Sequence, residues 1–223
     1  TSTSLLTVSG EVTGGKAVGG MIGLNLATAL PAADIKVTEI SGALCVGGVI
    51  GANMPVAGTD GTAFTITSAT SGGTVSTFKT TAKAGRIKAD GLAGGIIGCV
   101  TQNTKLEGCT NYGIVSHKSA AGGIAGWNGG SIKNCSTYAT LGTQQDGYAY
   151  LGGIVGINNG TVTDSAPAAN ITVRGRYIIG GVAGLNLTNA SITYNTSNNI
   201  IPVTVQANEC AGGVAGVNCG NIA

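Results

Sequence analysis

Hydrophobic and polar residues in this chain follow a short motif that recurs along its length. The motif reads Gly-Gly-apolar, then an apolar or small residue, then Gly, and an asparagine usually follows two residues later. Seven copies begin at Gly19, Gly47, Gly94, Gly122, Gly152, Gly180 and Gly212. The steps between successive copies are 28, 47, 28, 30, 28 and 32 residues. A period in this range is typical of a solenoid, in which each repeat forms one coil and neighbouring coils share a core.

Within each repeat, apolar and polar residues alternate with a period of two, which predicts short strands with one buried face. One strand is the motif itself, a second surrounds an apolar residue such as Ile132, and a third leads into the next motif, as at 148–151. A further short strand is expected at 170–173. The sequence therefore predicts an all-β protein, a right-handed parallel β-solenoid of about seven coils of 28–32 residues, forming a single domain over 1–223.

The segment 52–93 interrupts this rhythm, because 47 residues separate the second motif from the third. It is rich in threonine and contains two apolar runs, 63–67 and 75–79, separated by Ser71-Gly72-Gly73. We predict that this segment forms either an irregular coil or an inserted hairpin.

One asparagine recurs six residues after the first glycine of the motif. Only the third coil departs from this, with Val100, and the other six carry Asn25, Asn53, Asn128, Asn158, Asn186 and Asn218. Stacked coils bring equivalent residues to about 4.8 Å from each other, so their amides can hydrogen-bond along the stack. We expect a structural asparagine ladder. The paired glycines imply either a positive φ or the close approach of another backbone.

Few residues of the chain are charged, which limits the classes of partner that it is expected to bind. Only 9% of its residues are charged, the net charge is +2, and 40 residues are glycine. This composition favours neither nucleic acid nor an anionic membrane as a partner, and no apolar run reaches the roughly 18 residues of a membrane helix. A Thr/Ser/Asn/Gly-rich composition favours a secreted or cell-surface, extracellular location. Because the chain begins at Thr1 without a methionine, we expect it to be a fragment of a longer chain.

The seven motifs with their asparagines resemble the GLUG-type repeat of bacterial surface adhesins, which also occurs in the non-catalytic region of some immunoglobulin A peptidases. The resemblance is strongest from Gly94 to Asn218. It implies a secreted, repetitive cell-surface protein of a bacterium. It implies no peptidase activity, because the zinc-peptidase signature His-Glu-x-x-His is absent and His117 is the only histidine.

Two cysteines share one phase of the repeat. Cys109 and Cys135 each lie three residues after an apolar strand residue, Leu106 and Ile132. Equivalent positions on neighbouring coils are close enough for a disulfide. Two buried free thiols at a small inward position fit the same spacing, because a free cysteine behaves as a small hydrophobic residue.

The other cysteines have no neighbour in phase. Cys45 and Cys210 share a phase but lie many coils apart, so they and Cys219 are candidates for links between subunits. Cys99 has no partner in register. No Cys-x-x-Cys pair occurs and the nine acidic residues scatter over different phases, so we expect no metal, no cofactor and no catalytic carboxylate pair.

Tyr112 and Tyr138 also share a phase, each three residues after its cysteine. They are expected to stack, either as packing at a corner or as an exposed aromatic platform for sugar rings. Trp127 occupies an apolar position and is expected to be buried or half-buried.

These features predict a non-enzymatic structural or adhesive repeat domain, a surface rod or stalk that contacts an unknown ligand on host or neighbouring cells. The alternative is a subunit of an extracellular filament that self-associates end to end through open solenoid ends. A minor alternative is a carbohydrate-binding or carbohydrate-active β-helix.

Overall fold

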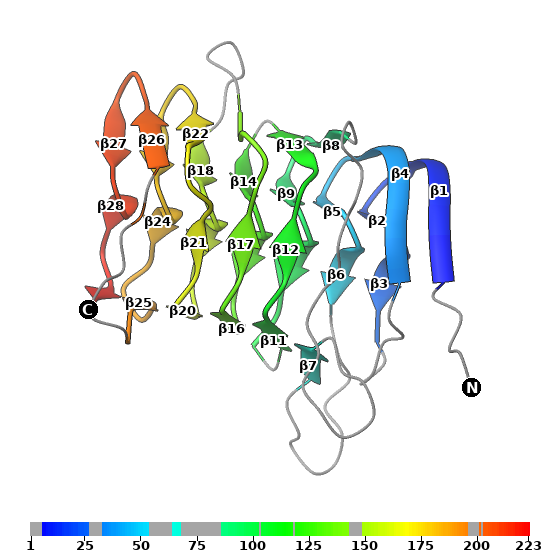
Figure 1. Ribbon diagram of the computed structural model, residues 1–223, viewed down its shortest axis with the longest axis horizontal. Coiled ribbons are helices and arrows are strands. Elements are labelled where there is room, and N and C mark those ends of the chain that lie inside the picture. The colour runs from blue at the N-terminus through cyan, green and yellow to red at the C-terminus, as the bar shows by residue number, and fades with distance from the viewer. Residues whose placement is uncertain are drawn as a thin grey trace.

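The computed structural model describes residues 6–26, 33–53, 64–67, 86–102, 104–117, 119–142, 149–195, 201 and 203–223. Over these ranges the chain consists of short strands that pair in parallel with the equivalent strands of the preceding and following coils. The colour in Figure 1 runs steadily from one end of the stack to the other, so each coil lies beside its neighbours in sequence. The predicted all-β parallel β-solenoid is confirmed. None of the described segments forms a helix that could span a bilayer.

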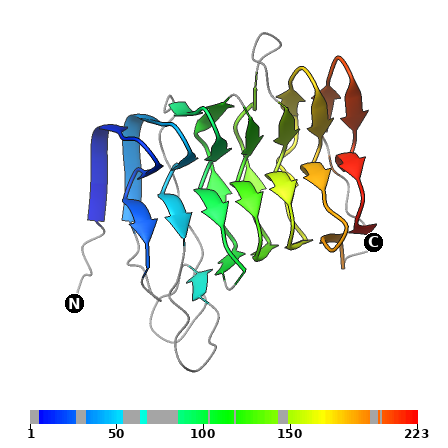
Figure 2. The ribbon, with the colours of Figure 1, turned by 180° about the vertical axis from the view of Figure 1, so that it is seen from behind.

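Two seven-stranded sheets carry the Gly-Gly motif (Figure 2). The entry sheet, which ends at the first glycine of each motif, contains β2 (Ala17–Gly19), β5 (Cys45–Gly47), β9 (Leu92–Gly94), β14 (Ala120–Gly122), β18 (Tyr150–Gly152), β23 (Ile178–Gly180) and β27 (Cys210–Gly212). The exit sheet, which follows the motif turn, contains β3 (Ile22–Asn25), β6 (Ile50–Asn53), β10 (Ile97–Val100), β15 (Ala125–Asn128), β19 (Val155–Asn158), β24 (Ala183–Asn186) and β28 (Ala215–Asn218).

The rest of each coil is covered by shorter sheets. A six-stranded sheet follows the exit sheet and contains β7 (Phe64–Thr67), β11 (Thr104–Glu107), β16 (Ser131–Lys133), β20 (Thr161–Thr163), β25 (Ser191–Thr193) and β29 (Asn221–Ile222). A three-stranded sheet, which the sequence did not predict, contains β12 (Thr110–Asn111), β17 (Ser136–Thr137) and β21 (Ala166–Pro167). The return to the next motif uses β1 (Leu6–Thr13), β4 (Ala33–Gly42), β8 (Arg86–Ala89) and β13 (Ile114–His117), and later β22 (Ile171–Arg174) and β26 (Val203–Gln206).

The number of complete turns is about five, fewer than the seven that the motif count predicts. Each of the seven motifs does supply a strand to both the entry and the exit sheet. The other faces hold six, four, three or two strands, so several coils lack one or more faces within the described ranges.

Rows of aliphatic side chains form the core along the axis of the stack. Ile132 pairs in register with Leu106 on one side and with Val162 on the other, and all three are fully buried. The turn residue of the motif forms a second row, in which Ile124 and Ile154 are also fully buried. Burying one such side chain contributes about 1.5–3 kcal/mol, so stability accumulates coil by coil.

The described parts of 52–93 belong to the stack. Strand β7 pairs in parallel with β11, and β8 lies between β4 and β13. The choice between an irregular coil and an inserted hairpin stays a prediction, because most of the segment lies outside the described residues. The apolar run 75–79 lies outside those residues.

Motif glycines that lie against another coil are required by the close approach of backbones, and not by a positive φ. Among the glycines that the structure describes, positive φ occurs at Gly10, Gly108 and Gly142, none of which belongs to the motif. A Cβ atom at Gly152 would lie 2.6 Å from Val182 O of the next coil. Of the two explanations offered by the sequence, the structure shows the second.

Candidate functional site

The recurring asparagines form a continuous ladder through the last four coils. Asn128 Nδ2 donates to Asn158 Oδ1 at 2.8 Å, Asn158 Nδ2 to Asn186 Oδ1 at 2.8 Å, and Asn186 Nδ2 to Asn218 Oδ1 at 2.7 Å. Asn128, Asn158 and Asn186 are fully buried. Asn128 and Asn158 also close their own turns, because Asn128 Oδ1 accepts from Gly130 N at 3.1 Å and Asn158 Oδ1 accepts from Gly160 N at 3.3 Å. The amides therefore hold the coils in register, which is a structural role.

A threonine replaces the missing asparagine of the third coil. Asn25 Nδ2 donates to Asn53 Oδ1 at 2.6 Å, and Asn53 Nδ2 then donates to Thr104 Oγ1 at 2.8 Å. Val100, at the asparagine position, is buried and apolar. Thr104 comes from the next strand, so counting residues from the motif could not identify it.

Cys109 and Cys135 are buried free thiols on adjacent coils, which is one of the two arrangements that the sequence allowed. They belong to a hydrogen-bonded row: Cys109 N donates to Cys135 Sγ at 3.3 Å, and Cys135 N donates to Ser165 Oγ at 3.0 Å. Cys135 Sγ in turn donates to Lys133 O at 3.2 Å. The hydrogen bond with Cys135 and burial raise the pKa of Cys109. The neutral thiol of Cys135 thus fills the hydrogen-bonding role that the hydroxyl of Ser165 fills on the next coil.

Cys45 does not suit a link between subunits, because it is buried and its strand, β5, lies against β10, which carries Cys99. Cys99 has no cysteine in register, as the sequence predicted, because its register neighbours are Ala52 and Trp127. Cys45 lies in an entry strand and Cys99 in an exit strand. A comparison of residues at equal positions of the repeat therefore could not predict that the two are neighbours. Cys210 and Cys219 are exposed free thiols on the last coil, where a link to another molecule stays a prediction.

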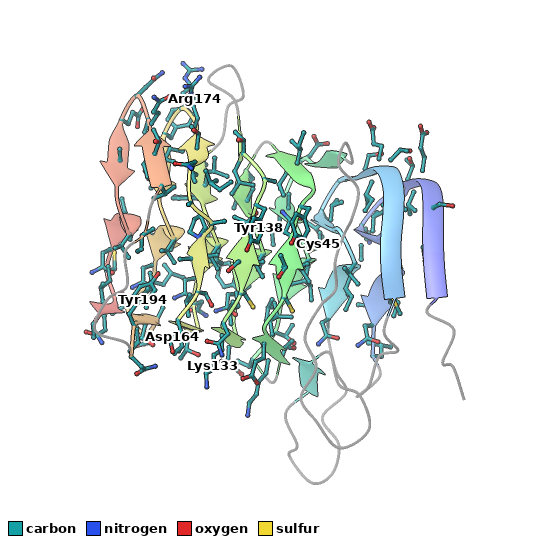
Figure 3. The ribbon with its side chains drawn as sticks, viewed as in Figure 1. Cys45, Lys133, Tyr138, Asp164, Arg174 and Tyr194 are labelled. Atoms are coloured by element: carbon teal, nitrogen blue, oxygen red, sulfur yellow. The ribbon has the colours of Figure 1, made fainter. Side chains whose placement is uncertain are left out.

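The two tyrosines form a stacked pair on the outer surface. The ring centroids of Tyr112 and Tyr138 are 4.9 Å apart and the ring planes differ by 16°. Tyr138 is 53% exposed, and Figure 3 shows it on the face formed by β12, β17 and β21. On the next coil Ala168 takes the equivalent place, so the tyrosine row ends with Tyr138. The exposed ring of Tyr138 offers apolar area together with a hydroxyl on this face.

Trp127 lies half-buried in the exit sheet, in register between Cys99 and Ile157, as the sequence predicted. It belongs to the outward row of that sheet and packs along the stack.

A polar corner follows the six-stranded sheet and was not identified from the sequence. Asp164 has a φ of 47° and receives hydrogen bonds from Asn195 N at 2.8 Å and from Asn195 Nδ2 at 3.0 Å. These bonds, with a smaller contribution from Lys133, lower the pKa of the Asp164 carboxyl. Beside it, Tyr194 Oη donates to Ser165 O at 2.8 Å, and burial raises the pKa of the phenol (Figure 3).

The lowered pKa of Asp164 predicts a small gain in stability with rising pH. Its contribution is present above the pKa of the unfolded chain and is lost as the pH falls through the folded pKa. Asn195→Ala removes the Nδ2 donor and keeps the backbone donor, so the pKa of Asp164 should return only part of the way to its ordinary value. A carboxyl-carbon NMR titration of both proteins measures this, and an unchanged midpoint would show that the side-chain bond contributes nothing.

In the described part of the chain, no group of three or more His, Cys, Asp or Glu side chains is arranged to hold a metal ion. Comparison of the chain with protein-family models, with curated proteins and with solved structures gives no match. The resemblance of the motif to the GLUG-type repeat therefore stays a prediction.

Proposed function

We propose that this chain is a non-enzymatic extracellular repeat domain, a rod that displays an adhesive surface. The observation that carries the proposal is the unbroken stacking of equivalent strands. One sheet runs through all seven motifs from β3 to β28, and the Asn128–Asn218 ladder runs inside it. Such an arrangement holds two distant points of a molecule at a fixed separation, which is what a stalk requires.

The composition of the surface supports contact with neutral ligands. With 9% charged residues, the outer faces offer hydroxyl and amide groups in place of strong charges. The stacked Tyr112 and Tyr138 add an aromatic surface on one face. Recognition of a glycan or of a protein surface through shape, stacking and neutral hydrogen bonds suits this chemistry better than recognition of a polyanion does.

An immobilised array of oligosaccharides and extracellular-matrix proteins tests the adhesive surface. We expect a ligand whose affinity falls about tenfold in Tyr138→Ala, because an aromatic contact is worth about 0.5–1.5 kcal/mol beyond its buried area. Tyr177→Ala is the matched control, since Tyr177 contacts Arg176 in a different part of the coil. Equal binding by both variants would remove the tyrosine pair from the proposal.

The mass of the native particle separates the stalk from the filament. Light scattering should give a monodisperse species near 21.7 kDa for a rod that functions as a single chain. Long particles of regular width, present with and without reductant, would instead favour the alternative of an extracellular filament.

A further inference from the structure

We propose that Cys45 and Cys99 form a redox pair that closes to a disulfide in an oxidising environment and fastens the second coil to the third. The side chains of the two cysteines lie close enough for each to shift the pKa of the other. They come from β5 of the entry sheet and β10 of the exit sheet, which contact each other. This site is independent of the proposed adhesive role, because it concerns only how two coils are joined.

The backbones of the two strands approach each other closely at this point. A Cβ atom at Gly98 would lie 2.6 Å from Val46 N and 2.8 Å from the carbonyl carbon of Cys45. The chain segments that carry the two thiols are therefore in van der Waals contact. A disulfide joins Cα atoms about 4.4–6.8 Å apart, a separation that requires strands to approach each other as closely as these do.

The same approach of an entry strand to the exit strand of the next coil recurs along the stack, as between β23 and β28. Ile178 occupies the position of Cys45 in the sixth coil, and its Cγ2 lies 2.9 Å from where a Cβ of Gly216 would be. Its neighbour there is Val217, which occupies the position of Cys99. Of the contacts between successive coils at these two positions, only that between the second and third coils has cysteine on both sides. Two positions that pack apolar side chains in other coils thus both hold cysteine at the contact between the second and third coils.

The solvent exposure of Cys99 and the pKa of Cys45 distinguish this pair from Cys109 and Cys135. Cys99 is partly exposed, whereas Cys109 and Cys135 are 1% and 0% exposed. The hydrogen bond from Cys99 lowers the pKa of Cys45, and the same bond with burial raises the pKa of Cys99. The first thiolate of the pair is therefore stabilised by the remaining S–H group.

Oxidised glutathione, a small-molecule disulfide, serves as the oxidant. A thiolate of the pair attacks one of its sulfurs, so that a mixed disulfide forms and one glutathione leaves as a thiolate. The second cysteine then loses its proton and attacks the protein sulfur of the mixed disulfide, which releases the second glutathione. In total, two protein thiols and one glutathione disulfide give one protein disulfide and two glutathione thiols.

Incubation of the folded protein with a glutathione redox buffer, followed by acid quenching, alkylation and non-reducing trypsin digestion, tests the proposal. Cleavage after lysine and arginine places Cys45 in 37–79, Cys99 in 89–105, Cys109 in 106–118 and Cys135 in 134–174. We expect a linked peptide of 37–79 with 89–105 that has lost two hydrogen atoms. Oxidation should also raise the midpoint of thermal unfolding by about 5–10 °C, reversibly with reductant.

Two variants make the outcome decisive. Cys99→Ala should abolish both the linked peptide and the shift in midpoint, and it should fold because alanine stands at the equivalent position in Ala52. Cys109→Ser should retain both. The proposal is overturned if Cys99 is recovered alkylated or glutathionylated without a link to Cys45, or if the linked peptides match those obtained after oxidation in urea.

Discussion

Gly153→Ala is expected to lower the free energy of unfolding by at least about 3 kcal/mol. The added Cβ would collide with Gly181 O of the next coil and with the Cγ atom of Pro167. Overpacking of a well-packed core costs about 1–3 kcal/mol when side chains can move aside. Here one of the obstructing atoms is the backbone oxygen of Gly181, which lies between two paired strands, β23 and β24. The coils themselves would therefore have to separate.

Gly213→Ala is the matched control for this substitution. Gly213 is the same second glycine of the motif, but a Cβ there would meet no atom within 4 Å. The two variants thus share the change in unfolded-state entropy and differ in steric contact. Chemical denaturation followed by far-UV circular dichroism measures both, and similar losses in the two variants would show that close coil approach does not explain the motif.

The repeat period and the asparagine ladder are features that sequence analysis predicts well. Both follow from one physical fact, which is that stacking places residues of equal phase beside each other. Asn158 and Asn186 share a phase, so their contact could be read from the spacing alone. The inward rows of aliphatic residues, such as Ile132 and Val162, follow from the same argument.

Contacts between residues of different phase could not be predicted in this way. Cys45 and Cys99 influence each other's pKa although they differ in phase, because the entry strand of one coil lies against the exit strand of the next. Asn53 bonds to Thr104 because the asparagine expected in the third coil is absent. Both contacts depend on the path of the chain around the coil, which the spacing does not fix.

Two further local features were not predicted from the sequence, each for its own reason. The strand Thr110–Asn111 is too short to show an alternating pattern. The polar corner did leave a signal: Gly108, Asn134 and Asp164 occupy one phase and all have positive φ. Glycine, asparagine and aspartate are the residues that best tolerate this conformation, so a comparison of this column alone could have identified the corner.

Asn158→Asp is expected to cost about 4 kcal/mol or more at neutral pH, although it changes the shape of the side chain very little. The carboxylate can still accept from Asn128 Nδ2 and from Gly160 N. It cannot donate to Asn186 Oδ1 or to Ser191 O, which lie 2.8 and 3.2 Å from the present amide nitrogen. The substitution therefore sets a fully buried negative charge against two oxygen atoms.

The pH dependence of this loss separates the effect of charge from that of shape. Burial and the two facing oxygens should raise the folded pKa of the introduced carboxyl above its unfolded value. The folded state then binds the proton more tightly, so the deficit relative to the native protein should be smallest below the unfolded pKa and should grow as the pH rises. Denaturant titrations of both proteins across this range measure the deficit at each pH.

Asn218→Asp provides the matched control, because Asn218 occupies the same position and is exposed. Its Nδ2 donates only to the nearby Gly220 O at 3.1 Å, and its Oδ1 still serves Asn186 after the substitution. Water can solvate the new charge there, so the expected loss is about 1 kcal/mol or less, with little dependence on pH. A deficit of equal size at both positions would mean that the asparagines act independently at their turns. A large deficit confined to Asn158 would show that the donor between coils is what the buried amide provides.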